Sequence, residues 1–227
     1  MPSATTSAPA GRNQHNNAEA EFAPTWNGVI HSTQDALVII EACLSGKLSH
    51  VPRRPHDKER GEQIKSGSIF VYEENASGIK RWTDGLTWSP SRIMGNFLVY
   101  RELEKPFPPG EKKRAVKRKR NASEGYDPKE ASRPAAQSVA VTNFAASLSA
   151  DEQRRLLGSL VDSYGFKEGG LVKKTMSVKY KGATHHIISY YSLEDVVADQ
   201  LTRPMCDTFL RVLPIRPELF SDQNFRA

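Results

Sequence analysis

The chain has 227 residues, of which 38% are hydrophobic and 26% are charged, so it is long enough for one large core or two small ones. Its formal net charge is +6, but the segment 112–120, KKRAVKRKR, holds seven basic residues and no acid, which leaves the rest close to neutral. Cys43 and Cys206 show no pairing pattern, which argues against a disulfide scaffold and an extracellular protein. The longest apolar stretch, 36–44, is interrupted by Glu41, and the N-terminus has no signal-peptide core, so we expect neither secretion nor a membrane span.

The first half of the chain is expected to form a compact α+β unit from residue 22 to residue 105. Residues 1 to 21 contain no bulky apolar side chain after Met1, so they cannot offset the entropy of ordering, and we expect disorder there. The apolar patterns then predict, in chain order, a short strand at 25–30, a helix at about 33–45, a polar loop at 51–63, a strand at 67–72 and its pairing partner at 97–100.

Residues 106 to 147 are rich in proline, lysine, arginine, serine and alanine and lack apolar periodicity, which predicts a flexible basic linker. A second α+β unit is expected over residues 148 to 219, followed by a tail at 220–227. Its predicted elements are a helix capped by Ser149 and Glu152 and ending near Gly165, a strand at 171–180, a turn at Lys181 and Gly182, a strand at 185–191, a helix from Ser192 to about Asp199, and a last strand at 209–213.

The strand at 171–180 alternates between two kinds of face. Val172, Met176, Val178 and Tyr180 share one face with Lys174 among them, whereas Lys173, Thr175, Ser177 and Lys179 share the other.

The stretch from Lys80 to Arg92, KRWTDGLTWSPSR, contains two adjacent basic residues, two tryptophans and several hydroxyl residues. This mix is suited to contacting DNA phosphates and to reading the edges of nucleobases. Lys80, Arg81 and Arg92 are the candidates for those contacts, and Trp82 or Trp88 would brace the loop.

Within the same stretch, Ser89 followed by Pro90 predicts the start of a short helix whose free amide groups would hold a phosphate. The alternative is purely structural: both tryptophans anchor a core, Asp84 caps a turn and the arginines form surface ion pairs. The residues by themselves leave both interpretations open.

Several long motifs resemble a WOPR domain, the domain of a fungus-specific family of transcriptional regulators. The first half of that domain is matched by TWNGVI, GSIFVYEE, KRWTDGLTWSPSR and NFLVYREL, and the second half by GLVKKTMSVKY and HHIISYYS. The resemblance implies an α+β fold in which two small lobes share antiparallel β-sheet and are joined by a disordered basic linker. It also implies sequence-specific binding of double-stranded DNA at a short A/T-rich promoter element, in the control of fungal morphology, development or virulence genes.

Arg81 and Arg92 are the first candidates for DNA contact, because an A·T-rich site has a narrow, electronegative minor groove that attracts arginine. Arg53, Arg54, Lys173, Lys174 and Thr175 match basic positions of the family, although solvated surface charge is the alternative for each. The full set of expected DNA-binding residues is Arg53, Arg54, Lys80, Arg81, Trp82, Thr83, Ser89, Ser91, Arg92, Lys173, Lys174 and Thr175.

The basic run fits a nuclear localisation signal, with a nonspecific phosphate-binding arm as the alternative. Its residues are Lys112, Lys113, Arg114, Lys117, Arg118, Lys119 and Arg120. The family resemblance further implies phosphorylation of Thr83 by a cyclic-AMP-dependent kinase, which would place negative charge beside Arg81 and weaken DNA binding.

No catalytic motif or metal-ligand spacing occurs in the sequence, so we expect no enzyme, no cofactor and no metal. The competing hypothesis is an adaptor module that binds acidic protein partners through the same basic loops and uses the linker only for nuclear import. RNA binding ranks third, because the paired-aromatic signature of a common RNA-binding sheet is missing.

Overall fold

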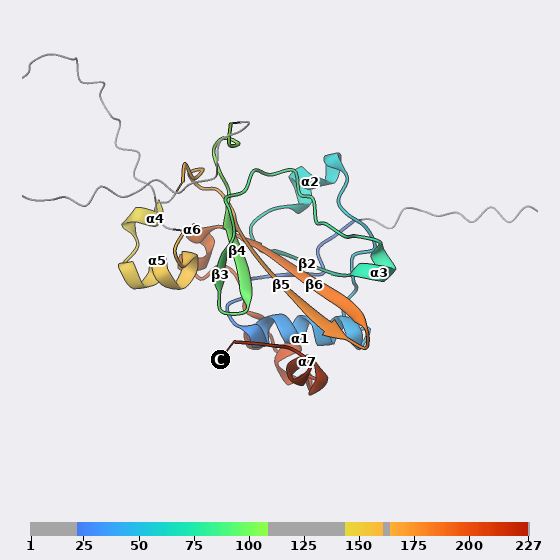
Figure 1. The fold of residues 1–227 in the computed structure, drawn as a ribbon. Coiled ribbons are helices and arrows are strands. Elements are labelled where there is room, and N and C mark those ends of the chain that lie inside the picture. Colours follow the sequence, from blue (N-terminus) through green and yellow to red (C-terminus); the bar gives the residue numbers. More distant parts are fainter. Residues whose placement is uncertain (1–21, 109–143, 161–163, 227) are drawn as a thin grey trace, which may run out of the picture.

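The computed structural model describes residues 22–108, 144–160 and 164–226 (Figure 1). Its centre is one antiparallel six-stranded sheet in the order β1-β2-β6-β5-β4-β3. The strands are β1 (Trp26–Asn27), β2 (Ser68–Glu73), β3 (Arg92–Met94), β4 (Phe97–Arg101), β5 (Val172–Tyr180) and β6 (Ala183–Tyr191). The expected α+β fold with a sheet shared by both halves of the chain is therefore confirmed.

The second half supplies the middle of this sheet. The β5–β6 hairpin is inserted between β2 and β4, so first-half strands lie on both sides of it. The expectation that β4 pairs with β2 is wrong for this reason: Val99 of β4 lies opposite Lys174 of β5, and Phe70 of β2 lies opposite Ile188 of β6. Neither half could close the sheet by itself.

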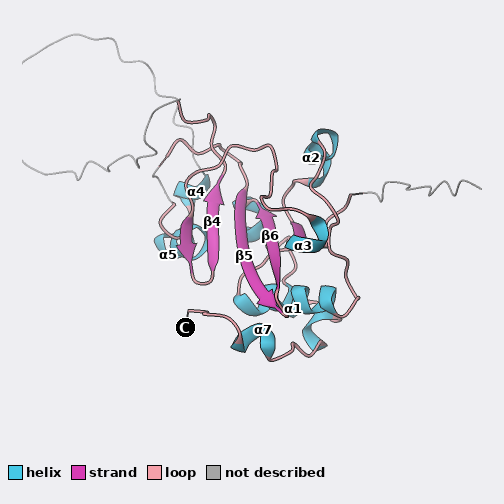
Figure 2. Cartoon of the chain, turned by 45° about the vertical axis from the view of Figure 1, so that its right-hand side comes forward, coloured by secondary structure: helices cyan, strands magenta, loops and turns pink. Residues whose placement is uncertain are grey.

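Helices pack around the sheet. In Figure 1, α1 and α7 lie together below the β5–β6 hairpin and α5 lies beside β3, and Figure 2 shows α4 and α5 to the left of β4. The helices are α1 (Thr33–Leu44), α2 (Asp57–Gln63), α3 (Glu74–Ser77), α4 (Phe144–Ser147), α5 (Ala150–Leu157), α6 (Leu193–Val197) and α7 (Glu218–Ser221), with 3-10 turns η1 (Pro204–Cys206) and η2 (Leu210–Val212). No helix within the described ranges is long and apolar enough to cross a membrane.

Local capping signals begin two of these helices at the expected places. The hydroxyl of Ser32 accepts a hydrogen bond from the amide of Asp35 while the Asp35 carboxylate accepts one from the amide of Ser32, which starts α1. Ser149 and Glu152 form the same reciprocal pair at the start of α5.

Four local predictions differ from the structure. The segment 51–63, expected as a loop, includes α2, because Glu59 closes a capping box on the amide of His56. No helix starts at Ser89, because its amide and hydroxyl bond the backbone of Arg101. The helix α5 ends at Leu157, where Gly158 takes a positive φ of 58°, and the expected strand at 209–213 is the 3-10 turn η2.

The sheet has two faces with different partners. One face packs on α1 and carries the main core, including Val71, Val99 and Val178. The opposite face carries a second cluster around Phe70 and Tyr190, which is covered by the segment that leads into β3. The expected alternation along β5 assigns residues to these two faces.

The predicted linker and N-terminal segment lie mainly outside the described residues. Residues 1–21 and 109–143 are not described, and these include the whole basic run 112–120. The described parts of the expected linker are residues 106–108 and α4.

Leu37 of α1 provides a test of the main core. Its side chain is fully buried under the sheet, so Leu37→Ala removes buried apolar volume and leaves a cavity. We expect the free energy of unfolding to fall by about 2–5 kcal/mol in urea denaturation. Ile93→Ala is the control, because that side chain is 58% exposed, and a loss as large as that for Leu37→Ala would contradict the described core.

Candidate functional site

The buried carboxylate of Asp84 organises the loop between α3 and β3. Its Oδ1 accepts hydrogen bonds from the indole of Trp88 at 2.9 Å and the amide of Leu86 at 3.2 Å. Its Oδ2 accepts from the Tyr190 hydroxyl at 2.7 Å and forms an ion pair with the Lys173 ammonium at 2.9 Å. We call residues 80–91 the Trp loop, and Asp84 with Trp82, Trp88, Lys173 and Tyr190 the Asp84 network. Asp84 thus ties the loop to β5 and β6.

Both tryptophans belong to this network and pack on the sheet. The indole of Trp82 donates to the Tyr190 hydroxyl at 2.7 Å and stacks on Tyr72, with ring centroids 5.7 Å apart and planes 11° apart. The Lys173 ammonium lies 4.3 Å from the centroid of the Trp88 ring. The two tryptophans therefore brace the loop, which agrees with both interpretations of the sequence.

The ion pair at the centre of the network is charged at neutral pH. Burial acts to raise the pKa of Asp84, but the Lys173 ammonium and the hydrogen bonds from Trp88 and Tyr190 outweigh it and lower that pKa. Burial lowers the pKa of Lys173 although Asp84 acts to raise it. Because four donors surround its carboxylate and its pKa is lowered, Asp84 is ionised at neutral pH and forms a charged pair with Lys173.

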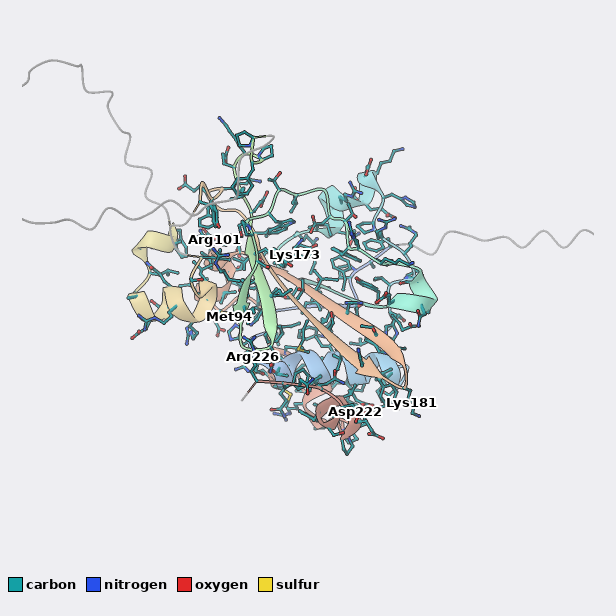
Figure 3. All side chains as sticks on the ribbon, in the orientation of Figure 1. Met94, Arg101, Lys173, Lys181, Asp222 and Arg226 are labelled. Atoms are coloured by element: carbon teal, nitrogen blue, oxygen red, sulfur yellow. The ribbon has the colours of Figure 1, made fainter. Side chains whose placement is uncertain are left out.

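A groove of about 440 Å³ opens beside the network, over β5 and β6. Its polar lining comes from Arg81, Ser89, Lys173, Thr175 and Ser177, and its aromatic lining from Tyr72, Trp82, Trp88, Tyr100 and His186. In Figure 3, Lys173 lies at the end of β5, close to Arg101 of the neighbouring β4. The groove lining therefore combines polar and basic residues with aromatic ones.

Two cations and one threonine of the Trp loop are exposed to solvent. Lys80, Arg81 and Thr83 are exposed, whereas Asp84 is only 4% exposed. The guanidinium of the exposed Arg54 approaches the hydroxyl of Thr83 at 3.4 Å. The structure thus brings together residues from two separate basic motifs of the sequence.

Arg53 is held differently from its neighbour. Its guanidinium forms two hydrogen bonds of 2.7 Å with the carboxylate of Glu59 and lies over the ring of Phe22. This forked ion pair fixes the residues that follow, so Arg53 positions the loop that carries Arg54.

Of the three remaining predicted residues of the first half, only Ser89 lines the groove. Ser89 lines the groove but is 3% exposed, with its hydroxyl bonded to the backbone of Pro90 and Arg101. Ser91 and Arg92 lie at the sheet edge, where Arg92 donates to the Tyr164 hydroxyl at 3.2 Å. Arg92 is therefore not part of the groove lining.

Lys173 and Lys174 serve opposite faces of the sheet. The Lys174 ammonium is buried on the α1 side, where it donates to the carbonyls of Ile30 at 3.0 Å and His31 at 3.1 Å. Burial lowers the pKa of Lys174 to about 8. Thr175 faces the groove, as its position on β5 requires. Of the expected basic motif on this strand, only Lys173 and Thr175 thus reach the groove.

Sequence reasoning missed several groove residues. Ser177 shares the face of Lys173, so the alternation of β5 already contained that signal. Tyr72, Tyr100 and His186 carried no local signal, because only the strand order brings them beside β5. Among the described residues, no group of three or more histidine, cysteine, aspartate or glutamate side chains is placed to hold a metal ion.

Asp84→Asn tests the Asp84 network. The change leaves Lys173, whose side chain is only 12% exposed, without its carboxylate, so we expect a loss of about 3–5 kcal/mol in the free energy of unfolding at pH 7. Because the folded pKa of Asp84 lies below 3.8, this stabilisation is complete above that value and is lost as the pH falls through the folded pKa.

The measurement is urea unfolding of both proteins from pH 7 to pH 3, with Asp151→Asn as the control, since the Asp151 side chain is 93% exposed. The stability difference between wild type and Asp84→Asn must shrink in acid. A difference that stays constant with pH would contradict an ionised Asp84.

This chain is similar to proteins of a known family. Residues 25–192 match the profile of the Gti1/Pac2 family. The chain is 59% identical over 212 residues to the global transcription regulator sge1 of Gibberella moniliformis, covering 91% of this chain and 65% of that protein. It is 37% identical over 217 residues to the transcriptional regulator MIT1 of Saccharomyces cerevisiae, covering 87% and 32%. The chain thus spans less than two thirds of the length of these relatives.

A solved structure is also similar to this fold. The complex of the WOPR domain of Wor1 in Candida albicans with a 13 bp double-stranded DNA superposes with a TM-score of 0.56 at 34% sequence identity, covering 88% of this chain and 95% of that one. The named relatives are transcription regulators, which agrees with the expectation that this chain is not an enzyme. Since the profile covers most of the chain and both relatives exceed 30% identity, the chain belongs to the Gti1/Pac2 family and has the fold of its WOPR domain.

Proposed function

We propose that this chain is a nuclear regulator of transcription that binds a short A/T-rich element in double-stranded DNA. The observation that carries the proposal is the Trp loop, which presents exposed Lys80, Arg81 and Thr83 while the Asp84 network holds its other side. The DNA bound to the WOPR domain of Candida albicans Wor1 supports the same partner for this chain.

The proposed recognition face consists of Arg54, Lys80, Arg81 and Thr83 together with the groove-lining Lys173 and Thr175. Arg81 is the residue proposed to enter the narrow minor groove of an A/T-rich site, because it is exposed and also lines the groove. Arg54 and Lys80 would contact phosphates as solvated cations.

The buried and half-buried members of the predicted set have positioning roles in this proposal. Trp82 and Ser89 hold the loop, and Lys173 neutralises Asp84 and therefore offers little free charge. A loop held in one conformation loses little entropy when it binds, which favours affinity. Ser91 and Arg92 at the sheet edge would make a separate contact with the DNA phosphate backbone.

The basic run 112–120 is proposed to serve nuclear import. Its seven bases also suit nonspecific phosphate contact, which strengthens binding without reading sequence. The controlled genes are proposed to be those of fungal morphology, development or virulence. The names of the relatives as global transcription regulators support a broad programme of targets.

Arg81→Ala should weaken binding to an A/T-rich duplex by about 1–3 kcal/mol, because it removes a base-reading or groove-inserted cation. The measurement is a gel-shift titration with the A/T-rich duplex against a scrambled duplex. Arg211→Ala is the matched control, since Arg211 is also exposed but lies in η2 on the α1 side of the sheet.

Loss of affinity for both duplexes alike would reduce Arg81 to a phosphate contact. Equal affinity of the wild-type chain for the two duplexes would remove sequence specificity. Binding to neither duplex, together with binding to an acidic polypeptide such as polyglutamate, would favour the adaptor hypothesis instead.

Thr83→Glu should weaken specific binding by about tenfold, because a negative charge beside Arg54 and Arg81 opposes the DNA phosphates. A cyclic-AMP-dependent kinase is the proposed source of the corresponding phosphate. Thr83→Val, which keeps the shape and adds no charge, is the control in the same titration. Equal binding by the Glu and Val variants would contradict control by charge at this residue.

A further inference from the structure

A second hollow lies on the other side of the sheet from the recognition face. It has a volume of about 180 Å³ and lies where the segment before α1, strand β3, helix α5 and strands β5 and β6 meet. Most of its walls are buried: Ile30 is 1% exposed, Tyr191 3%, Lys174 4% and Leu156 6%. We call this hollow the seam pocket, because its walls come from both halves of the chain.

The seam pocket has an apolar body. Val29, Ile30, Met94, Leu156 and Tyr191 contribute its hydrophobic lining. An apolar cavity of roughly 150 Å³ is large enough to hold a benzene ring. The seam pocket therefore has room for a six-membered ring or a branched chain of similar size.

The polar lining of the pocket contains two cations, Arg155 and Lys174, and no acid. It includes His31, Arg155 and the buried Lys174. Two donors of the Lys174 ammonium reach the carbonyls of Ile30 and His31, which leaves the third for a ligand or for the Phe97 ring 4.3 Å away. Arg155 is exposed and follows Glu152 by three residues on α5, where, after the hydrogen bonds from Ser149, its charge lowers the pKa of that carboxylate.

The Asp35 carboxylate, which acts on His31 and Lys174, is already compensated. Asp35 is fully buried and accepts hydrogen bonds from its own helix cap, from the Arg203 guanidinium at 3.1 Å and from the amide of Met205 at 3.3 Å. Burial lowers the pKa of His31, and the neighbouring Arg203 and Lys174 cations lower it further, in spite of Asp35. Three cations, Arg203, Lys174 and Arg155, and one carboxylate, Asp35, thus act on His31 at the pocket wall.

We propose that the seam pocket binds a small monocarboxylate with an apolar body about the size of benzoate. The carboxylate is placed between Lys174 and Arg155, and the ring fills the space among Ile30, Met94 and Leu156. A buried lysine and an exposed arginine beside a mainly apolar cavity suit this pairing of one charge with one hydrophobic body. The ligand contacts both halves of the chain and therefore stabilises their association.

The test uses benzoate as the probe and the methyl signal of Met94 as the local readout. With ¹³C-methyl methionine, benzoate should move the Met94 resonance and leave that of Met205 unchanged, since Met205 does not line the pocket. At ten times Kd, benzoate should also raise Tm by about 3–6 °C. Benzamide, which has the same shape without the charge, should bind at least roughly tenfold more weakly.

Two neighbouring arginines provide a matched pair of variants. Arg155→Gln should weaken benzoate binding roughly tenfold. Arg154→Gln should leave it unchanged, because Arg154 is exposed on the same helix and pairs with Asp151. Lys174→Met should abolish benzoate binding. Met94→Trp should also abolish it, because the larger side chain fills the pocket from its partly exposed edge, and this variant replaces the lysine variant if that one does not fold.

The proposal is overturned if benzoate leaves Met94 and Tm unchanged, if benzamide binds as tightly as benzoate, or if the two arginine variants behave alike. None of these measurements involves DNA, so their outcome is independent of the proposed function.

Discussion

The carboxylate of Asp84 is the point on which the presentation of the Trp loop depends. One buried side chain accepts hydrogen bonds from Trp88, Leu86 and Tyr190 and balances the charge of Lys173. Each of these contacts is strong because water is largely excluded, and each would be costly to leave unmade. The loop therefore has one low-energy arrangement on the sheet, in which its tryptophans face inward and its free cations face outward.

The same network depends on how the two halves combine. Asp84 belongs to the first half, whereas Lys173 and Tyr190 lie on the central hairpin from the second half. Because β5 and β6 separate β2 from β4, the hairpin provides the surface on which the Trp loop rests and also closes the main core against α1. A long connection between the halves adds little to the closure cost, since that cost grows only with the logarithm of its length. The sheet, rather than the connection, thus fixes the arrangement.

Local signals in the sequence predicted much of the fold, and long-range pairing limited the rest. The capping pair of Ser149 and Glu152 and the alternation of β5 depend on neighbouring residues, so they could be recognised directly. Ser89 failed as a helix start, because its hydroxyl bonds the backbone of Arg101, twelve residues away. For the site, the Trp loop was identified by composition and resemblance. The ion pair of Asp84 with Lys173, 89 residues apart, had no local signature.

One charged residue fixes the Trp loop on the sheet, and other charged residues are proposed to contact DNA. Lys173 lies in the groove but is committed to Asp84, whereas Arg54, Lys80 and Arg81 remain solvated. Salt screens solvated charges much more than a buried pair, so the network keeps its geometry under conditions that weaken contacts of the exposed cations. Because the chain outside the basic run is close to neutral, these few cations dominate the local potential of the proposed recognition face. A charge added at Thr83, 3.4 Å from Arg54, therefore acts where the free positive charge is concentrated and leaves the supporting network intact.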